Sequence, residues 1–537
     1  MATETLIPKE EEKEEKLSNL PVKKLDPEAY LLHAALNGVS KYATSRAKRT
    51  IITPSDEPLL NLSATKAAAD IRNGKIKSLD LIQAYFKRIK DINPFINAAT
   101  ELFEAEAVEL AKEADELVEK TKGKKDKIEQ LKKEKPLLGI PVSLKHNLNY
   151  KGHRNICGLL HLRSSPLAKS NATCVERVLQ AGGIPICYTN VPPGCLSLES
   201  DNAVFGRTLS PHDSRTTCGG SSGGEAALIA AQGSLIGIGS DLGGSIRIPS
   251  ILCGIYGLKP GPTGCPLDGF VPPLAFPPEK RGMCVVGPMV RYAEDLGLLH
   301  NVLASTPIPF NIGALQPSKI YSCAPEALPL VRLNREVRHV WEDVRNYLTG
   351  TYHLSNNEFK LGKTLPEFMV MLSAMAFQEF DMNEFLSPGE HITVLKEFVK
   401  LLTRSSPLSF GALSSYHAFT KKLPQHVINE ALKQVQVLRK RIGKLLEDNA
   451  ILLFPALPET HYFHAAAFPT VCAYTSPFNV LGLPCLAVPC GRDRLGYPLA
   501  VQLVGGVGSE NLLCAVAEKI EEKFEGWVKP HGVAVEE

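Results

Sequence analysis

A glycine- and serine-rich stretch, residues 219–250, holds the residues best suited to chemistry. Its sequence is GGSSGGEAALIAAQGSLIGIGSDLGGSIRIPS. Clustered glycines let the backbone turn sharply and approach a ligand closely, because they lack a Cβ. In such a loop several N–H groups can converge on one oxygen and stabilise negative charge. This pattern predicts an oxyanion site at Leu242, Gly243 and Gly244, with Ser245 as the nucleophile that attacks a carbonyl carbon.

Three other interpretations of this stretch fit less well. Plain linkers are also rich in Gly and Ser, but they do not lie between strongly apolar elements. Phosphate-binding loops follow GxGxxG or GxxxxGK[ST], and neither pattern occurs here. Gly219-x-Ser221-x-Gly223 does match the nucleophile elbow of α/β-hydrolases, which requires a buried strand immediately before it. Residues 210–218, SPHDSRTTC, are instead polar and typical of a turn.

A serine hydroxyl needs a base before it becomes a good nucleophile, and neither glycine loop contains a histidine. Lys145 is the alternative, because it ends the apolar segment LLGIPVSLK, residues 137–145. A lysine there can lie exposed at a sheet edge or point into a buried site, and the strand alone leaves both open. If the lysine is buried, desolvation disfavours the charged ammonium and leaves a neutral amine that can accept a proton.

The elements around these residues have the pattern of a mixed α/β core. The loop at 219–224 is expected to open a helix near Glu225, and residues 234–239 are expected to form a buried strand. Short segments rich in Val and Ile alternate with turns and helical stretches, which is typical of buried strands between helices. These segments are LLGIPVSL, IPICYT, SLIGIGS, ILLFP, LAVPC and LAVQLVG. The chain is therefore predicted to be α/β, with a mixed twisted sheet surrounded by helices.

Helical periodicity marks the segments on either side of this core. Two helices are expected between Ser63 and Asn93, with Ser78 as the N-cap of the second and Asn93-Pro94 as its end. Its apolar stripe is Ile82, Tyr85, Ile89 and Ile92. Another helix is expected at 101–118, and residues 335–450 are expected to be mostly helical. The charge run at 121–136 is expected to be solvated.

The N-terminal region divides into two predicted parts ahead of the main domain, residues 61–537. Residues 1–26 are charged and poor in apolar residues, which predicts a disordered tail. Residues 27–49 have apolar positions at helical spacing and a basic end, and a linker to residue 60 follows. Such a helix can lie on a membrane surface or pack on the domain, and composition leaves both open. The chain shows neither a signal peptide nor a run of about 18 apolar residues.

The totals exclude several classes of protein. A formal charge of +3 over 537 residues is too small to indicate a nucleic-acid binder. The 13 cysteines are scattered, with no CxxC pair and no spacing that indicates a metal site or disulfide framework. Reduced thiols are therefore the simpler expectation. They predict a protein located in the cytoplasm, either free or bound peripherally to an intracellular membrane.

Taken together, these residues resemble the amidase signature family, over roughly residues 60–530. The 219–250 stretch is that family's defining segment. The resemblance implies an amidase-signature domain with a catalytic triad of Lys145 (of PVSLK), Ser221 (first serine of GGSSGG) and Ser245 (of DLGGS). It also implies hydrogen-bonding support around the site and a cysteine lining the pocket, and it requires neither metal nor organic cofactor. The supporting residues are Ser222, Ser240, Asp241 and Arg247, and the pocket cysteine is Cys195.

Within the family the chain is similar to the fatty acid amide hydrolases of animals. The stretches that carry this likeness include VSLKHNLNYKGH, TNVPPGCLSLES, FGRTLSPHD, GPMVRYAEDL, SPFNVLGLPCLAVPCG, GYPLAVQLVGG and GWVKP. The likeness implies hydrolysis of lipid amides to a fatty acid and an amine, and a homodimer is common among such relatives. It also makes residues 392–419 a second candidate for peripheral membrane contact, beside 27–49. A core helix pair is the alternative for 392–419.

Two rival functions share some of these features. One is that of the A-type amidotransferase component, which releases ammonia from glutamine for tRNA-linked transamidation inside a larger assembly. The other is a lipid-binding protein without catalysis. The presence of all three triad residues, Lys145, Ser221 and Ser245, favours an enzyme over the second rival.

Overall fold

The structure is a computed structural model. It describes residues 20, 42, 44 and 46–531, apart from 274–279, 281, 306–314, 324–332, 404, 421 and 466–468. Almost all of the predicted tail, residues 1–26, and most of the predicted amphipathic helix, residues 27–49, therefore lie outside the described residues.

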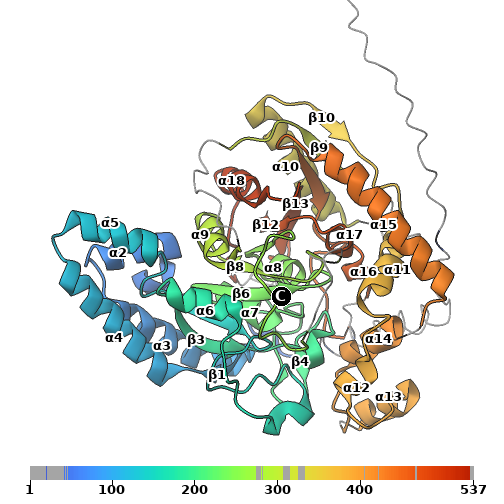
Figure 1. Ribbon diagram of the computed structural model, residues 1–537, viewed down its shortest axis with the longest axis horizontal. Helices are drawn as coiled ribbons and strands as arrows, with labels where there is room; N and C mark the ends of the chain where they lie inside the picture. Colours follow the sequence, from blue (N-terminus) through green and yellow to red (C-terminus); the bar gives the residue numbers. More distant parts are fainter. Residues whose placement is uncertain are drawn as a thin grey trace, which may run out of the picture.

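Eleven strands form one mixed sheet through the middle of the molecule (Figure 1). In spatial order the strands are β1 (Ala99–Leu102), β3 (Ile184–Thr189), β2 (Pro141–Lys145), β6 (Ile236–Asp241), β8 (Val285–Val290), β7 (Tyr256–Lys259), β12 (Cys485–Arg492), β13 (Pro498–Gly505), β11 (Ile451–Pro455), β9 (Ile320–Ser322) and β10 (Asn356–Glu358). A small separate ladder pairs β4 (Asp201–Asn202) with β5 (Gly206–Arg207). Strand β2 runs parallel to both β3 and β6, whereas β8 is antiparallel to β6. The predicted mixed α/β fold is confirmed.

Alternate side chains of the central strands point to opposite faces of the sheet, and apolar groups cover both faces. Val142 and Leu144 of β2 pack in one core cluster with Ile236 and Ile238 of β6. Helices α6 (Thr173–Gln180), α9 (Glu294–Leu303) and α18 (Glu510–Glu521) cover that face. Two fully buried helices, α7 (Gly223–Ala230) and α8 (Arg247–Cys253), cover the other face. These two helices begin at the two glycine–serine loops, so the sheet brings both loops together.

The remaining helices surround this core (Figure 1). Helices α2 (Ala64–Arg72), α3 (Ser78–Ile96), α4 (Glu104–Thr121) and α5 (Lys125–Glu134) lie at the β1 end, in blue. Helices α10 (Arg335–Tyr352), α11 (Leu365–Ala376), α15 (Gln425–Leu445), α16 (Pro469–Cys472) and α17 (Ser476–Val480) lie toward the β10 end. Helices α12 (Met382–Leu386), α13 (Val394–Leu402) and α14 (Phe410–Phe419) form a group at the periphery, in orange. Short 3-10 turns are η1 (Pro58–Asn61), η2 (Leu160–Ser164) and η3 (Pro193–Cys195).

Helix α3 has the predicted core stripe, but both of its predicted ends are wrong. Ser78 is the first helical residue, because the Asp115 carboxylate caps the helix from α4 by accepting from the Ser78 N–H at 2.7 Å. The helix also continues through Pro94 to Ile96 and ends at Asn97, which has a left-handed φ of 48°. The four predicted stripe residues are buried as expected. A partner distant in sequence therefore decides the start of this helix.

Two other features bear on the sequence predictions. The charge run at 121–136 contains helix α5, of which only Leu131 is buried, so its other side chains are largely solvated as expected. Residues 335–450 are mostly helical as predicted, with the short strand β10 among them. Within the described part of the chain, every helix is too short or too polar to cross a lipid bilayer.

Candidate active site

Lys145 ends strand β2 in the interior of the protein, with no solvent exposure. Its Nζ lies 2.7 Å from the Ser221 Oγ and 2.8 Å from the Ser240 Oγ. Parallel pairing with β6 explains the second contact, because it places the end of β2 beside Ser240. Of the two orientations that the strand alone left open, the structure has the buried one. An amine that touches two hydroxyls can pass a proton between them.

Ser221 belongs to the GGSSGG loop that precedes α7, and it follows a cis peptide bond, Gly220–Ser221. The loop is tied to the second glycine–serine loop, since the Ser222 N–H donates to the Ser245 carbonyl at 3.2 Å. The Ser222 hydroxyl also meets the backbone of Ser240, at 3.4 Å from both its N and its O. No strand precedes the loop within residues 208–218, so the hydrolase elbow is excluded here.

The Asp241 carboxylate holds the turn that carries the predicted oxyanion donors. It accepts from the Gly244 N–H at 2.7 Å and from the Ile246 N–H at 3.2 Å. Gly244 has a φ of +128°, and a Cβ there would lie 2.1 Å from the Thr475 Oγ1, so glycine is required. The Gly244 N–H is therefore already engaged, although the sequence suggested that Gly244 faces the substrate oxygen.

The other candidate oxyanion donors lie on either side of Gly244. In the part of the chain that the structure describes, the amides of Leu242, Gly243 and Ser245 make no hydrogen bond. The Gly243 carbonyl is fixed from the far side by the Thr475 hydroxyl at 2.5 Å and the Cys472 thiol at 2.9 Å. The peptide between Gly243 and Gly244 is thus held at both its oxygen and its nitrogen.

Arg247 braces the same turn from behind. Its guanidinium binds Asp241 through two bonds, of 3.0 and 3.1 Å, and both side chains have no solvent exposure. It also donates to the Asn479 side chain at 2.6 Å and to the Gln502 side chain at 3.1 Å. Burial by itself raises the pKa of Asp241, but the charge and hydrogen bonds of Arg247, together with the Asn479 hydrogen bond and the charge of Lys259, outweigh it and hold that pKa well below the usual range. Asp241 therefore stays ionised and keeps the turn closed.

Glu225 lies at the start of α7, behind Lys145. Its carboxyl accepts from the Thr189 hydroxyl at 2.5 Å and from the Ser143 hydroxyl. These two hydroxyls belong to β3 and β2, so the carboxyl joins the helix to both strands. Burial raises the pKa of Glu225 to about 7, and the two hydroxyls oppose that rise.

A pocket opens onto these groups. It is lined by polar groups of the site, by the thiols of Cys195 and Cys284, and by apolar side chains that include four phenylalanines. The other lining residues are Gly194, Leu196, Ser221, Ser240, Leu242, Ser245, Phe270, Pro272, Ala376, Phe377, Phe380 and Phe385. Its volume is about 50 Å³, enough for only a few atoms. Ser221 and Ser245 thus lie in one apolar pocket, whose far side is provided by α11 and α12.

Comparison with known proteins agrees with this geometry. A family model described as Amidase matches residues 80–514. The chain is 33% identical over 493 residues to fatty-acid amide hydrolase 2 of Homo sapiens, covering 89% of this chain and 92% of that protein. The chain belongs to the amidase signature family. This amidase is also 25% identical over 512 residues to the A component of the glutamyl-tRNA(Gln) amidotransferase of Caldanaerobacter subterraneus, covering 89% and 99%.

The fold of this amidase is also that of solved relatives. A structure titled fatty acid amide hydrolase superposes with a TM-score of 0.71 at 22% identity, covering 95% of this chain and 97% of that one. At this identity the likeness supports the fold alone. The family and fold that the sequence indicated are confirmed, and the site residues now have positions.

Sequence reasoning missed several residues of the amidase site. Thr475, Asn479 and Gln502 reach the loop from the C-terminal region, more than 200 residues away. Glu225 was identified only as a helix start. The apolar lining from Phe377, Phe380 and Phe385 was also missed. Only Glu225 carried a local signal, because a carboxylate at a fully apolar helix is unusual and needs partners.

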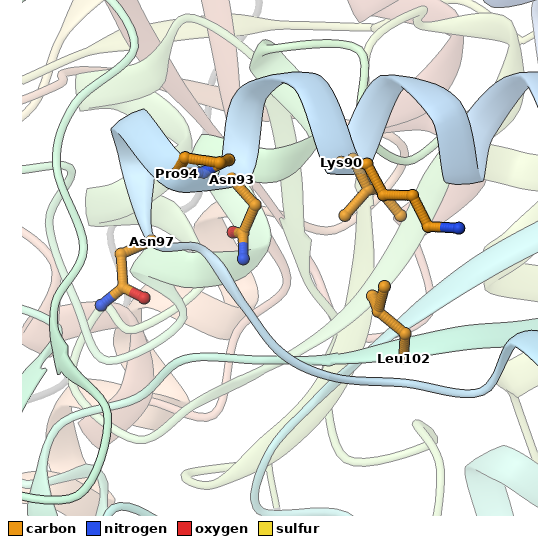
Figure 2. Close-up of a pocket in the computed structure, with 6 residues that line it drawn as sticks. Lys90, Asn93, Pro94, Asn97 and Leu102 are labelled. Carbon is orange, nitrogen blue, oxygen red and sulfur yellow. The ribbon is translucent and has the colours of Figure 1, made fainter.

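A second and larger pocket of the amidase does not belong to this site. It lies at the end of α3 and is shown in Figure 2, with a volume of about 460 Å³. Its polar groups are already engaged: Lys90 pairs with Glu104 at 2.8 Å, Asn93 binds the Ala99 carbonyl, and Asn97 binds a backbone carbonyl. Because these polar groups already have partners, they do not form a second candidate active site.

Proposed function

We propose that this amidase hydrolyses fatty acid amides with a Ser245 nucleophile, a Ser221 proton bridge and a Lys145 base. The observation that carries the proposal is the 2.7 Å contact between the Lys145 Nζ and the Ser221 Oγ, in a pocket that also holds Ser245. A buried amine next to a hydroxyl has the geometry required of a general base.

The reaction would proceed in two halves. The Ser245 Oγ attacks the amide carbon while its proton passes to the Ser221 Oγ, and the Ser221 proton passes to the Lys145 amine. The amides of Leu242, Gly243 and Ser245 would hold the negative oxygen. The proton then returns through Ser221 to the leaving nitrogen, which is a poor leaving group until it is protonated. Water hydrolyses the resulting acyl-serine ester.

The pocket lining supports a lipid substrate. Phe270, Phe377, Phe380 and Phe385 present apolar surface to the chemistry, and burying an acyl chain against such surface contributes about 0.8 kcal/mol per CH₂. The likeness to the human fatty-acid amide hydrolase 2 points to the same class. A cavity of about 50 Å³ is too small for a long chain, so the rings of Phe377 and Phe380, which follow α11, and of Phe385 in α12 would have to move on binding.

A lipid substrate must also reach the pocket from a lipid phase. Our candidate for the element that contacts the lipid surface is α13. Leu395, Val399 and Leu402 are 74%, 53% and 72% exposed and lie on one side of this helix, where i, i+4 and i+7 positions align. Lys396 and Lys400 lie beside them. Apolar side chains rimmed by cations fit an anionic lipid surface.

A substrate panel tests the proposal. Purified enzyme would be assayed with N-acylethanolamines, primary fatty amides and short amides, alongside Ser245→Ala as the inactive control. We expect long-chain amides to have the highest kcat/KM, and a fluorophosphonate probe to label wild type but not Ser245→Ala. Preference for glutamine, with activity appearing only when partner proteins are added, would support the amidotransferase function instead.

A further inference from the structure

Two thiols meet in the wall of the pocket. The Cys157 Sγ lies 3.7 Å from the Cys195 Sγ, and only the second thiol lines the pocket with Ser221 and Ser245. Cys157 is buried behind it, and its thiol also lies 3.4 Å from the Val271 carbonyl. Neither thiol has a part in the proposed proton relay, so the pair needs its own account.

The backbone forces the two cysteines together. The Gly194 N–H donates to the Cys157 carbonyl at 2.9 Å, so the two chain segments are joined next to both thiols. A Cβ on Gly158 would lie 2.9 Å from the Val191 carbonyl. The two backbone segments are therefore so close that no side chain fits between them at this position. Cys157 and Cys195 both have left-handed φ angles, of 48° and 60°.

Left-handed φ is energetically unfavourable for residues other than glycine. Here it occurs at both members of one contact. Such strain persists only where the surrounding structure imposes it, and it is concentrated at functional sites. The thiol pair is therefore built into the loop geometry.

The two thiols differ in acidity. Burial alone would raise the pKa of Cys195, but contacts with the Cys157 thiol, the Lys145 amine and the Ser221 hydroxyl outweigh burial and lower it. Burial raises the pKa of Cys157 well above the ordinary value. A pocket-facing thiol with thiolate character beside a second, protonated thiol is the arrangement of a reactive and a resolving cysteine.

We propose that Cys195 and Cys157 form an oxidative modification site that takes hydroperoxides and closes to a disulfide. The Cys195 thiolate attacks one peroxide oxygen and the O–O bond breaks. The leaving oxygen takes up the former thiol proton, which gives Cys195 sulfenic acid and water or an alcohol. The Cys157 sulfur then attacks the Cys195 sulfur, the S–O bond breaks, and the departing hydroxide takes the Cys157 proton as water. Two thiols are oxidised while one hydroperoxide is reduced.

The disulfide would change the pocket beside the proton bridge. Disulfide sulfurs lie about 2.05 Å apart, so the two sulfurs must come more than 1 Å closer together, in the wall of the pocket that also holds Ser221. A displacement of this size next to reacting groups can reduce turnover roughly 100-fold. This loss of amide hydrolysis rests on the proposed function, whereas formation of the disulfide does not.

Mass spectrometry of the full chain tests the modification itself. The reduced enzyme is treated with hydrogen peroxide, its remaining thiols are blocked with N-ethylmaleimide, and it is digested without reductant. We expect a peptide crosslinked through Cys157 and Cys195 that disappears with dithiothreitol. In Cys157→Ser the reaction should stop at sulfenic acid, captured at Cys195 by dimedone. If wild type forms no such crosslink while other thiols oxidise, the proposal is overturned.

A matched control uses the other thiol of the pocket, Cys284, whose pKa burial raises to about 12. Cys284→Ser should form the crosslink as wild type does, and its failure to do so would contradict a site made by Cys157 and Cys195 alone. Amide hydrolysis is then measured before and after peroxide. A loss reversed by dithiothreitol and absent from Cys157→Ser supports the effect on turnover, and an equal loss in Cys157→Ser overturns it. Absence of all amide turnover before peroxide would count against the proposed function only.

Discussion

Asp241 and Arg247 form an ion pair with no solvent exposure directly behind the loop that carries Ser245. The two residues are close in sequence, but Arg247 also binds groups from the C-terminal region. The pair therefore links the loop to a distant part of the chain. The Asp241 carboxylate simultaneously accepts the Gly244 N–H. The shape of the proposed oxyanion site therefore depends on a buried charge that never contacts the substrate.

Removing one partner of this pair should be costly. We expect Arg247→Met to lower the free energy of unfolding by about 3–5 kcal/mol, because it leaves the Asp241 carboxylate buried without its cation. Urea denaturation measures this change. The control is Lys519→Met, which breaks a solvent-screened pair with Glu522 and should change stability only slightly. Equal effects of the two substitutions would contradict the structural role of the pair.

Lys145→Met tests the proton relay, since it keeps the side chain's bulk and removes the amine. We expect kcat/KM for amides to fall by about 10²–10⁴-fold, the usual contribution of a general acid–base group. Esters with the same acyl group should lose less, because an alkoxide leaves more readily than an unprotonated amine. The measurement is kcat/KM of wild type and Lys145→Met for an amide and an ester with the same acyl group. An equal loss for amide and ester would rule out proton delivery to the leaving group.

Gly244→Ala tests the geometry of the loop. A Cβ there would lie 2.1 Å from the Thr475 Oγ1 at a φ of +128°, so we expect strong loss of both activity and stability. Gly443→Ala is the matched control, because a Cβ on this glycine of α15 meets no atom within 4 Å. Gly443 lies in the last turn of α15, so alanine there should leave stability unchanged or raise it by up to about 0.5–1 kcal/mol. Thermal unfolding and amide turnover are the measurements, and a tolerated Gly244→Ala would refute the tight turn.

Glu225 predicts a pH dependence of stability. Its folded pKa of about 7 exceeds the ordinary value of 4.5, so between these pH values the folded state binds more protons than the unfolded chain. Stability from this group is thus fully present below about pH 4.5 and is lost as pH rises to about 7, by up to about 3 kcal/mol.

Comparing wild type with Glu225→Gln isolates this contribution, because other groups titrate equally in both. Urea denaturation at pH 5 and pH 8 should show a larger decrease in the free energy of unfolding for wild type. Parallel decreases in the two proteins would mean that the Glu225 carboxyl does not keep its proton in the fold.

Contact of α13 with lipid can be tested by flotation with vesicles that contain anionic lipid. We expect the double substitution Leu395→Asp and Leu402→Asp to reduce the bound fraction, because it places charge on the apolar side of the helix. Leu495→Asp and Val507→Asp provide the control, since these residues are 50% and 60% exposed in turns away from α13. If both double variants float as wild type does, α13 is not the contact.

The sequence alone determined the parts of this protein that depend on neighbours in the chain. The Val- and Ile-rich segments became β2, β3, β6, β11, β12 and β13, because burial and propensity act over a few residues. The two glycine–serine loops were identified for the same reason: glycine's freedom is a local property. The family, and with it the candidate residues Lys145, Ser221 and Ser245, could also be inferred before any fold was known.

Tertiary structure decided everything that depends on which strands become neighbours. It placed Lys145 against Ser221 and brought Thr475 and Gln502 behind the loop that carries Ser245. It also placed the Cys157 thiol beside the Cys195 thiol. These contacts span tens to hundreds of residues and arise from packing the sheet and its helices, for which a local pattern carries no information.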